Sequence, residues 1–394
     1  MKDEFTDRHQ AIKLRLADRS VEDICQALGR SRDWFHTWWR RYQAMGVVGL
    51  YDLTRANHQP PRISPDLERS ILSIRRRLES QQHPQTRYSL IGASAILGEL
   101  TALHMLPLPC ERTIERVLAR NGVTTPRVRL ARFLPKQVYP APQAQRSNQL
   151  HLLDLVGPIY LKGKRQRHYI YVCRDAFDGA VCLKLSRSRH MEAVLVFLGE
   201  CWKTLGRPEQ LQFDNAREFV GWGPAAKYLS RVIRLCLRFS IEPIFIPPAQ
   251  PQRNGGVEWF NGWFQPRLLQ RHYGSAQALK RELQRLQTTV NTQHVQRRLG
   301  GLTPDQHRRR QKLQKLPARF TISLDPLPIA AGRVTFIRQV TPHGNIHLLS
   351  QTFKVGKRRK GQFVKAVLDT QQARLTVYVQ GRIIKRWPYP FVKS

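Results

Sequence analysis

Residues 150–155 read LHLLDL, and this stretch decides the fold of the region around it. A leucine-rich run of this length is typical of a strand buried inside a sheet. Two further strand-like runs follow at 168–173 and 180–185, with the turn Asp175–Gly179 between them. Asp154 interrupts the first run, and burying its charge is costly without a partner or a metal ion. The stretch therefore predicts the first strand of a sheet with a functional carboxylate in it.

The sequence beyond these strands alternates helices with strands. The expected elements are a helix at 189–205, a strand at 210–213, a helix near 225–238, a strand at 242–246, and helices after Asn254 and around 277–292. Such an alternation indicates helices packed on a mixed sheet. We therefore expect residues 149–304 to form an α/β domain.

Three acids occupy distinctive places in this domain. Asp154 lies within the first strand, Asp214 ends the fourth, and Glu258 enters a helix after the loop PPAQPQRNGGV at 247–257. Carboxylates from two strands and a helix are able to meet at one end of a sheet, and Mg²⁺ or Mn²⁺ prefers such hard oxygen ligands. Two ions together neutralise a scissile phosphate, activate the nucleophile and stabilise the leaving oxygen. We expect Asp154 to bridge both ions, Asp214 to hold one, and Glu258 the other.

Other acids near this set have two interpretations each. Asp175 and Asp178 either join the metal site or stabilise the turn before Gly179, and the structural role is favoured. Glu218 follows Asp214 closely and is either a supporting acid or, as we favour, a solvated loop residue.

The helix that contains Glu258 offers further candidates. Asn254 and Asn261 either orient the preceding loop or contact DNA, with helix capping as another alternative. Arg253 either contacts a phosphate or is an ordinary surface residue. The aromatic residues of this helix are expected to lie in the core rather than to stack on bases; they are Trp259, Phe260 and Trp263.

The N-terminal part predicts three short helices within residues 8–57. Leu28–Ser31 forms a tight turn, in which Ser31 is placed to cap the third helix, 32–44. That helix is basic and aromatic, as in a helix-turn-helix domain that binds the major groove. A plain three-helix bundle is the alternative. The candidate DNA contacts in this domain are Arg32, Arg40 and Arg41.

A proline-rich joint ends this first domain, 1–60, and a second helix-turn-helix-like domain is expected at 61–123. Its helices are predicted from Ser64-Pro65, at Tyr88–Leu100 and at Glu111–Arg120. A basic linker, 124–148, then leads into the α/β domain. This linker either lies along phosphates or is merely solvated.

The C-terminal part predicts a small all-β domain. After a second basic linker, 305–330, residues 331–394 alternate apolar and polar side chains between turns. This pattern predicts a small barrel of five or six strands. The run Lys357-Arg358-Arg359-Lys360 falls on a hairpin, where a barrel presents it to DNA. The fold class is thus multidomain, with all-α helix-turn-helix modules, a central α/β sheet and a β-barrel.

The charge of the chain restricts its partners. Lys and Arg number 66 against 28 Asp and Glu, giving a formal net charge of +38. Such a field favours polyanions, and DNA is the expected partner. A membrane surface is the competing polyanion, but no apolar run approaches the ~20 residues of a spanning helix, and no signal peptide is visible. Six scattered cysteines without a C-x-x-C pair fit buried thiols in a reducing cytoplasm.

The segment PQRNGGVEWFN at 251–261, taken with the three acids, resembles the insertion-sequence DDE transposases of the retroviral-integrase superfamily. The pattern Asn291-x-x-His294 and the segment LGGLTP at 299–304 are similar to the same family, and the resemblance spans 145–310. It implies an RNase H-like fold for the α/β domain. It also implies a polynucleotidyl transferase that cleaves the 3′ ends of a mobile element and joins them to other DNA.

The resemblance has implications for partners as well. The expected partners are double-stranded DNA, as terminal repeats and as target, and further copies of the chain on that DNA, in the bacterial cytoplasm at the nucleoid and without a membrane. Arg253, Asn254 and Arg267 are then candidate DNA contacts. Gln265 stands where the family often has a basic residue, and Arg267 is its substitute. His151 stands where the family often has Trp, and the zinc-binding His/Cys module of retroviral integrases is absent.

Two other functions remain open from the sequence. The first is a non-catalytic, transposase-derived DNA-binding regulator, which should lack at least one of the three acids. The second is an RNase H-like nuclease that hydrolyses DNA without joining it. Strand transfer in vitro distinguishes the transposase from both.

Overall fold

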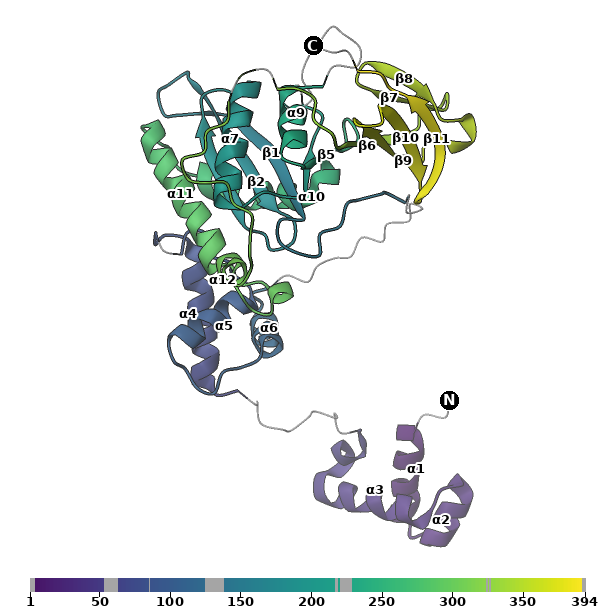
Figure 1. Cartoon of the computed structure of the whole chain (residues 1–394). Helices are drawn as coiled ribbons and strands as arrows, with labels where there is room; N and C mark the ends of the chain where they lie inside the picture. The colour runs from purple at the N-terminus through teal and green to yellow at the C-terminus, as the bar shows by residue number, and fades with distance from the viewer. Residues whose placement is uncertain are drawn as a thin grey trace. The chain divides into compact units, whose positions relative to one another are not determined.

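The computed structural model describes residues 4–52, 63–84, 86–124, 138–216, 219, 229–323, 325 and 327–391. The chain divides into two compact units, Met1–Ser64 and Pro65–Ser394. Each unit is described by itself below, and Figure 1 shows the elements of both. Glu218 and the start of the helix predicted near 225 lie outside the described residues.

The first unit is a small helical domain, as predicted. Its elements are α1 Glu4–Leu16, α2 Val21–Leu28, α3 Arg32–Met45 and the 3₁₀ helix η1 Gly46–Leu50. Gly29 ends α2 with a φ of 63°, a left-handed conformation that suits glycine. The hydroxyl of Ser31 accepts a hydrogen bond from the backbone nitrogen of Trp34 at 3.1 Å, so the predicted cap of α3 is confirmed. Phe35 and Trp38 of α3 point into the core.

The second unit begins with another three helices, α4 Pro65–Ser80, α5 Ala93–Ala102 and α6 Glu111–Arg120. The middle helix starts at Ala93, later than the predicted Tyr88. Tyr88 is instead fully buried, and its hydroxyl donates to Oε1 of Glu282 at 2.8 Å. Glu282 lies on α11, Ala276–Gln293, and also pairs with Arg87. These buried polar contacts fix the second helical module to the α/β region.

The centre of the second unit is a mixed sheet with the predicted strands. They are β1 Leu150–Tyr160, β2 Arg167–Asp175, β3 Val181–Ser186, β4 Gln210–Phe213 and β5 Glu242–Phe245. The order β5-β4-β1-β2-β3, in which β1–β3 are antiparallel while β4 and β5 run parallel to β1, is the mixed sheet expected of an RNase H-like fold.

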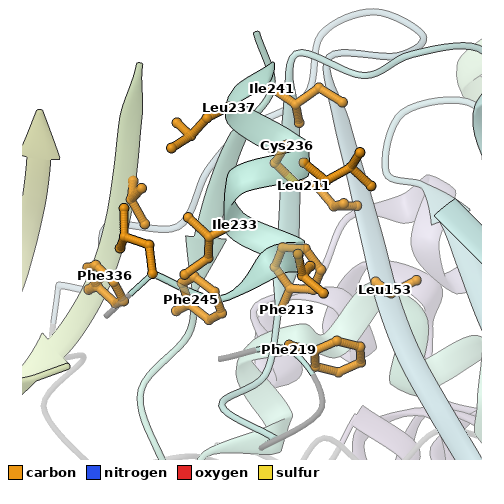
Figure 2. Close-up of a cluster of buried hydrophobic side chains, with 14 of the residues drawn as sticks. Leu153, Leu211, Phe213, Phe219, Ile233, Cys236, Leu237, Ile241, Phe245 and Phe336 are labelled. Atoms are coloured by element: carbon orange, nitrogen blue, oxygen red, sulfur yellow. The ribbon is translucent and has the colours of Figure 1, made fainter. Parts of the chain in front are cut away.

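Helices cover both faces of this sheet because side chains of β1 alternate between them. Leu153 belongs to the same core cluster as side chains of α7 Met191–Thr204 and α9 Arg231–Arg238. Figure 2 shows this cluster with Ile233 and Cys236 of α9. Leu152 points to the opposite face and packs with α10 Gly255–Leu269 and with α11. Asp154, two residues beyond Leu152, therefore lies on the side of α10.

The C-terminal strands correct one prediction. Six strands form as expected: β6 Arg333–Gln339, β7 Asn345–Leu348, β8 Gln351–Lys354, β9 Phe363–Asp369, β10 Arg374–Val379 and β11 Arg382–Pro388. No closed barrel forms among the described strands, because β6 pairs in parallel with β5 and extends the central sheet to nine strands. β7 and β8 form a separate hairpin. Backbone groups on one edge of β6 pair with β5, so this edge is covered without the strands closing into a barrel.

The segment predicted as a second linker also differs. Its first residues form α12, Pro304–Arg309, whose start is capped by Thr303 and Gln306. Arg308 in this helix is buried rather than solvated. Within the described part of the chain, no helix is both long and apolar enough to cross a membrane.

Candidate active site

The register of β1 and β4 brings two of the three predicted acids together. Leu152 pairs with Gln212 in a parallel ladder, and Asp154 and Asp214 each follow two residues later. Neighbouring strands lie about 4.8 Å apart, so the continued register places the two aspartates side by side. Asp154 is half-buried within β1, and Asp214 directly follows β4.

Helix α10 presents Glu258 to the same place. Asn254, Glu258 and Asn261 are spaced i, i+4 and i+7, so they share one face of the helix and its cap. Nδ2 of Asn254 donates to the carbonyl oxygen of Leu153 at 3.2 Å. Nδ2 of Asn261 donates to Oδ2 of Asp154 at 2.5 Å. Because the contacts on both sides of Glu258 reach Leu153 and Asp154, Glu258 faces β1 beside them.

Two local features make this approach of α10 to the sheet possible. A Cβ on Gly256 would lie 2.6 Å from Cδ1 of Leu152, so any larger residue here would require the Leu152 side chain to shift. Nε2 of Gln212 donates to Oδ1 of Asn254 at 3.0 Å, which ties the helix start to β4 as well as to β1. Asn254 thus links the elements that hold all three acids.

The charges of the other two acids act on Asp154. The pKa of Asp154 is raised to about 6, first by burial and then by the negative charges of Asp214 and Glu258. Hydrogen bonds from the Leu155 backbone nitrogen, at 2.8 Å, and from Asn261 oppose this rise. Burial also raises the pKa of Glu258. The site therefore holds negative charge that a cation or a proton would neutralise.

The donor set suits a hard divalent ion, because it consists of carboxylate oxygens. Within the described residues, however, no group of three or more His, Cys, Asp or Glu side chains is placed so that it could hold a metal ion. The three acids interact through their charges without closing around one point.

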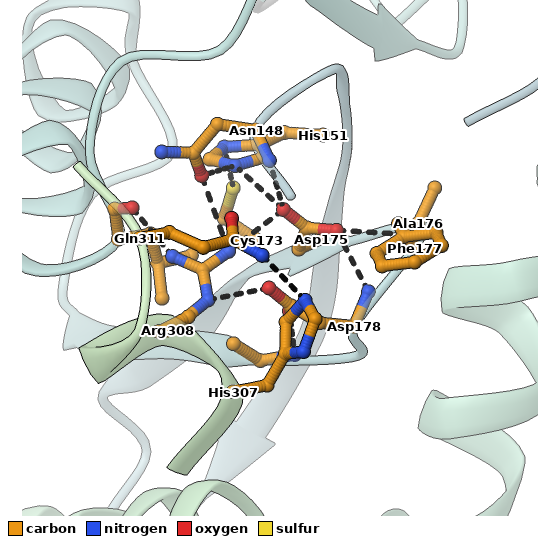
Figure 3. A network of polar contacts seen from close by, with 12 residues as sticks. Asn148, His151, Cys173, Asp175, Ala176, Phe177, Asp178, His307, Arg308 and Gln311 are labelled. Carbon is orange, nitrogen blue, oxygen red and sulfur yellow. Dashed lines mark hydrogen bonds and ion pairs between the residues drawn. The ribbon is translucent and has the colours of Figure 1, made fainter. Parts of the chain in front are cut away.

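A second group of acids lies in the same sheet and is neutralised internally (Figure 3). Oδ2 of Asp175 lies 2.7 Å from Nη2 of Arg308, and Oδ2 of Asp178 lies 2.7 Å from Nε of Arg308. Asp175 also accepts from the Asn148 backbone nitrogen at 2.6 Å. Although burial alone raises the pKa of Asp175, its hydrogen bond to His151 and the charges of His151 and Arg308 hold the pKa well below its usual range. These contacts favour the structural role for Asp175 and Asp178.

The predicted DNA contacts of the first unit lie on α3. Arg40 is exposed, and Arg32 is exposed and pairs with Glu22. Arg41 is half-buried; its Nη2 donates to the Tyr51 carbonyl at 2.7 Å, and its guanidinium lies 4.4 Å from the ring centre of Trp38. Arg40 is therefore the most accessible of the three.

The predicted contacts near Glu258 are more constrained. Asn254 is only 3% exposed, so in this structure it orients the loop instead of facing DNA. The guanidinium of Arg253 packs against two rings, 4.4 Å from the centre of Tyr139 and 4.8 Å from that of Phe363. Nη1 of Arg267 donates to the carbonyl of Trp263 at 2.6 Å. Both arginines are half-buried.

The basic run of the C-terminal region forms the 3₁₀ turn η4, Lys357–Arg359, between β8 and β9. Lys357, Arg358 and Lys360 are exposed, and Arg359 is half-buried. The run therefore presents several cations at one turn.

Sequence reasoning missed the residues that hold these groups in place. Gln212 is a polar residue inside a strand, two positions before Asp214, and this position weakly indicates a role near the site. Arg308 gave no such indication, because it lies in a run of arginines that reads as surface. Arg174 of β2, half-buried with its Nη1 donating to the Gly256 carbonyl at 2.6 Å, also lacked a distinguishing pattern.

Comparisons with known proteins agree with parts of this description. Residues 8–69 match the family model of the winged helix-turn helix, a class of DNA-binding domain. No curated protein sequence matches the chain. The chain is similar to the HTLV-2 integrase catalytic core domain in complex with magnesium, with 20% identity and a TM-score of 0.33, over 42% of this chain and 98% of that one.

Two further structures show similarity at the same level. A chain of the simian T-cell lymphotropic virus intasome, in complex with PP2A regulatory subunit B56 gamma, has 17% identity and a TM-score of 0.34, over 78% of this chain and 100% of that one. The catalytic core domain of BIV integrase has 18% identity and a TM-score of 0.30, over 40% and 92%. Because these TM-scores are low, the fold assignment rests on the strand order described above. The chain combines a winged helix-turn-helix region with an RNase H-like mixed sheet.

Proposed function

We propose that the chain is a DNA transposase or integrase, a DDE polynucleotidyl transferase in which Asp154, Asp214 and Glu258 form the active site. The observation that supports this most is the electrostatic effect at Asp154 on β1, where the negative charges of Asp214, which follows β4, and of Glu258 on α10 raise the pKa of its carboxyl. The helix-turn-helix match and the net charge of +38 supply the DNA-binding surface that such an enzyme needs.

The three carboxylates would hold Mg²⁺ or Mn²⁺, with two ions per active site. When bound, such ions neutralise the scissile phosphate and activate water or a 3′ hydroxyl. The residues around the acids have their own tasks. Asn261 orients the Asp154 carboxylate through its 2.5 Å hydrogen bond, and Asn254 fixes the start of α10 against Leu153. Copies of the chain would assemble on the two ends of a mobile element.

A plasmid assay tests this function. A supercoiled plasmid carrying the gene with its flanking DNA is incubated with the purified full chain, a second plasmid and Mg²⁺, and all new DNA junctions are sequenced. We expect 3′ ends freed at fixed borders and joined to the second plasmid. Protection of the borders without breaks would instead support the non-catalytic regulator, and breaks that are never joined would support a nuclease.

A further inference from the structure

Trp259 has surroundings that the proposed active site does not explain. It follows Glu258 on α10, yet 57% of it is exposed. Among the tryptophans that the structure describes, no other belongs to the exposed large apolar side chains. Its neighbours behave as the sequence predicts, since Phe260 is buried and Trp263 packs in a T-shaped contact on His294 at 5.1 Å. Core packing therefore does not explain why this indole is exposed next to a proposed metal ligand.

The helix surface around Trp259 is open. Gly255 and Gly262, at positions i−4 and i+3 from Trp259, lie on the same side of α10. A Cβ at either glycine would have no atom within 4 Å. Packing within the protein thus accounts for the glycine at position 256, which lies against Leu152. It does not account for the glycines at positions 255 and 262. Glycine inside a helix is destabilising relative to alanine, and it permits close approach by a ligand.

A half-buried cation supports the indole from the protein side. The guanidinium of Arg174 lies 5.3 Å from the ring centre of Trp259 and 5.7 Å from that of Phe260. Its Nη1 is held by the Gly256 carbonyl at 2.6 Å. A cation held near an aromatic ring attracts it electrostatically and limits its motion. The contact with Arg174 therefore favours one orientation of the exposed indole ring.

We propose that Trp259 is a base-binding residue, whose indole stacks on an unpaired nucleobase of the DNA next to the phosphate held at Asp154, Asp214 and Glu258. This inference rests on the proposed function. A nucleobase is the favoured occupant because DNA bound at Glu258 passes beside the next residue of the helix, and because every base has a face that stacks on an aromatic ring. The base must leave its stack to do so, as at a frayed end or a flipped position.

Fluorescence of 2-aminopurine tests the contact. The terminal duplex, located by protection of DNA bound to the full chain, carries 2-aminopurine at one position after another near the border. We expect the wild type and Trp259→Phe to quench the probe at one or two positions, and Trp259→Ala to leave it bright. Cleavage and joining by Trp259→Ala should fall about 5- to 150-fold, the range seen for loss of one base–aromatic stack. Leu269→Ala, an exposed apolar change on the same helix, is the matched control and should behave as wild type.

The outcomes separate this inference from the function on which it rests. Equal quenching and equal rates for Trp259→Ala and wild type would overturn the base-binding role while leaving the transposase proposal intact. If the wild type neither cuts nor joins DNA, the proposed function fails, but quenching that depends on Trp259 still supports the base site. Because Trp259 is exposed, its substitution should leave the melting temperature of the protein unchanged within about 2 °C.

Discussion

Two groups of acids in the same sheet have opposite environments. Asp175 and Asp178, at the end of β2 and in the following turn, both pair with the buried Arg308. Asp154, one strand away on β1, receives only hydrogen bonds from Leu155 and Asn261 in the contacts described. The pKa of Asp175 is correspondingly lowered, whereas that of Asp154 is raised to about 6.

This difference shows how a structural carboxylate is told from a functional one. A buried acid with its own arginine has its charge neutralised inside the protein, so it stabilises the fold and offers nothing to a ligand. A buried acid repelled by other acids weakens the fold and gains from any bound cation. From the sequence alone, Asp175 and Asp178 were candidates for the metal site as well as for the favoured structural role in the turn.

The largest expected effect comes from removing one of the proposed metal ligands. Asp154→Asn, Asp214→Asn and Glu258→Gln should each lower cleavage and joining at least about a thousandfold, because metal stabilisation of the transition state is worth several kcal/mol. DNA affinity, measured by anisotropy, should stay within about twofold. Glu209→Gln is the control, since this acid pairs with Arg146 at the surface. Joining by any ligand variant at the wild-type rate would remove that residue from the site.

The second effect is one of stability and concerns the other acid group. Arg308→Met should lower the free energy of unfolding by about 3–5 kcal/mol, because it removes the arginine that pairs with two buried carboxylates. Arg309→Met, one residue later and exposed, should change it by less than about 0.5 kcal/mol. Urea unfolding monitored by circular dichroism gives both values. Equal stabilities of the two variants would contradict the assignment of Asp175 and Asp178 as structural.

A smaller effect of opposite sign is expected for Asp154. Its pKa is about 6 in the folded chain against 3.8 as the ordinary value, so ionisation at high pH destabilises the fold. The folded state binds the proton more tightly, hence stability increases as the pH falls from about 6 to about 4. At pH 8 without divalent ions, Asp154→Asn should therefore stabilise the protein by about 1–3 kcal/mol.

Thermal melting with and without Mg²⁺ checks this prediction. Mg²⁺ should raise the melting temperature of the wild type and leave that of Asp154→Asn unchanged. A variant that melts below the wild type at pH 8 in the absence of metal would show that Asp154 is not under electrostatic strain.

The smallest effect is expected outside both acid groups, on α3 of the first unit. Arg40 is exposed on this helix, and a contact with one phosphate contributes about 0.9 to the slope of log affinity against log salt. Arg40→Gln should reduce the slope by about that amount. Arg15→Gln on α1, whose Nη1 donates to the Arg19 carbonyl, is the comparison and should leave the slope unchanged. Identical slopes for all three proteins would exclude Arg40 as a phosphate contact.

Much of the fold was predictable because it follows local pattern. The leucine run around Asp154, the turn before Gly179 and the cap at Ser31 all depend on nearby residues. The predicted barrel was wrong, since alternation determines which strands form but not which strands they pair with. Only the pairing of β6 with β5 decides between closing a barrel and extending the sheet.

The candidate site was predictable to a similar extent. Its three acids stood out as charges at strand and helix positions, whereas the residues that hold them did not. Asn254 was a candidate both for orienting the loop and for contacting DNA, and the two hydrogen bonds that decide this, with Leu153 and Gln212, depend on a crossing that spacing does not reveal. Trp259 and Trp263 look alike in sequence, and only the packing of α10 exposes one and half-buries the other.

Counting bound metal ions tests the central claim most directly. Mn²⁺ is titrated into the full chain bound to its terminal duplex, and the bound ions are measured by electron paramagnetic resonance. We expect about two Mn²⁺ per active site in the wild type, and clear loss of binding in Asp154→Asn with Arg309→Met unchanged. Equal Mn²⁺ binding by the wild type and Asp154→Asn would show that the three acids do not form the metal site.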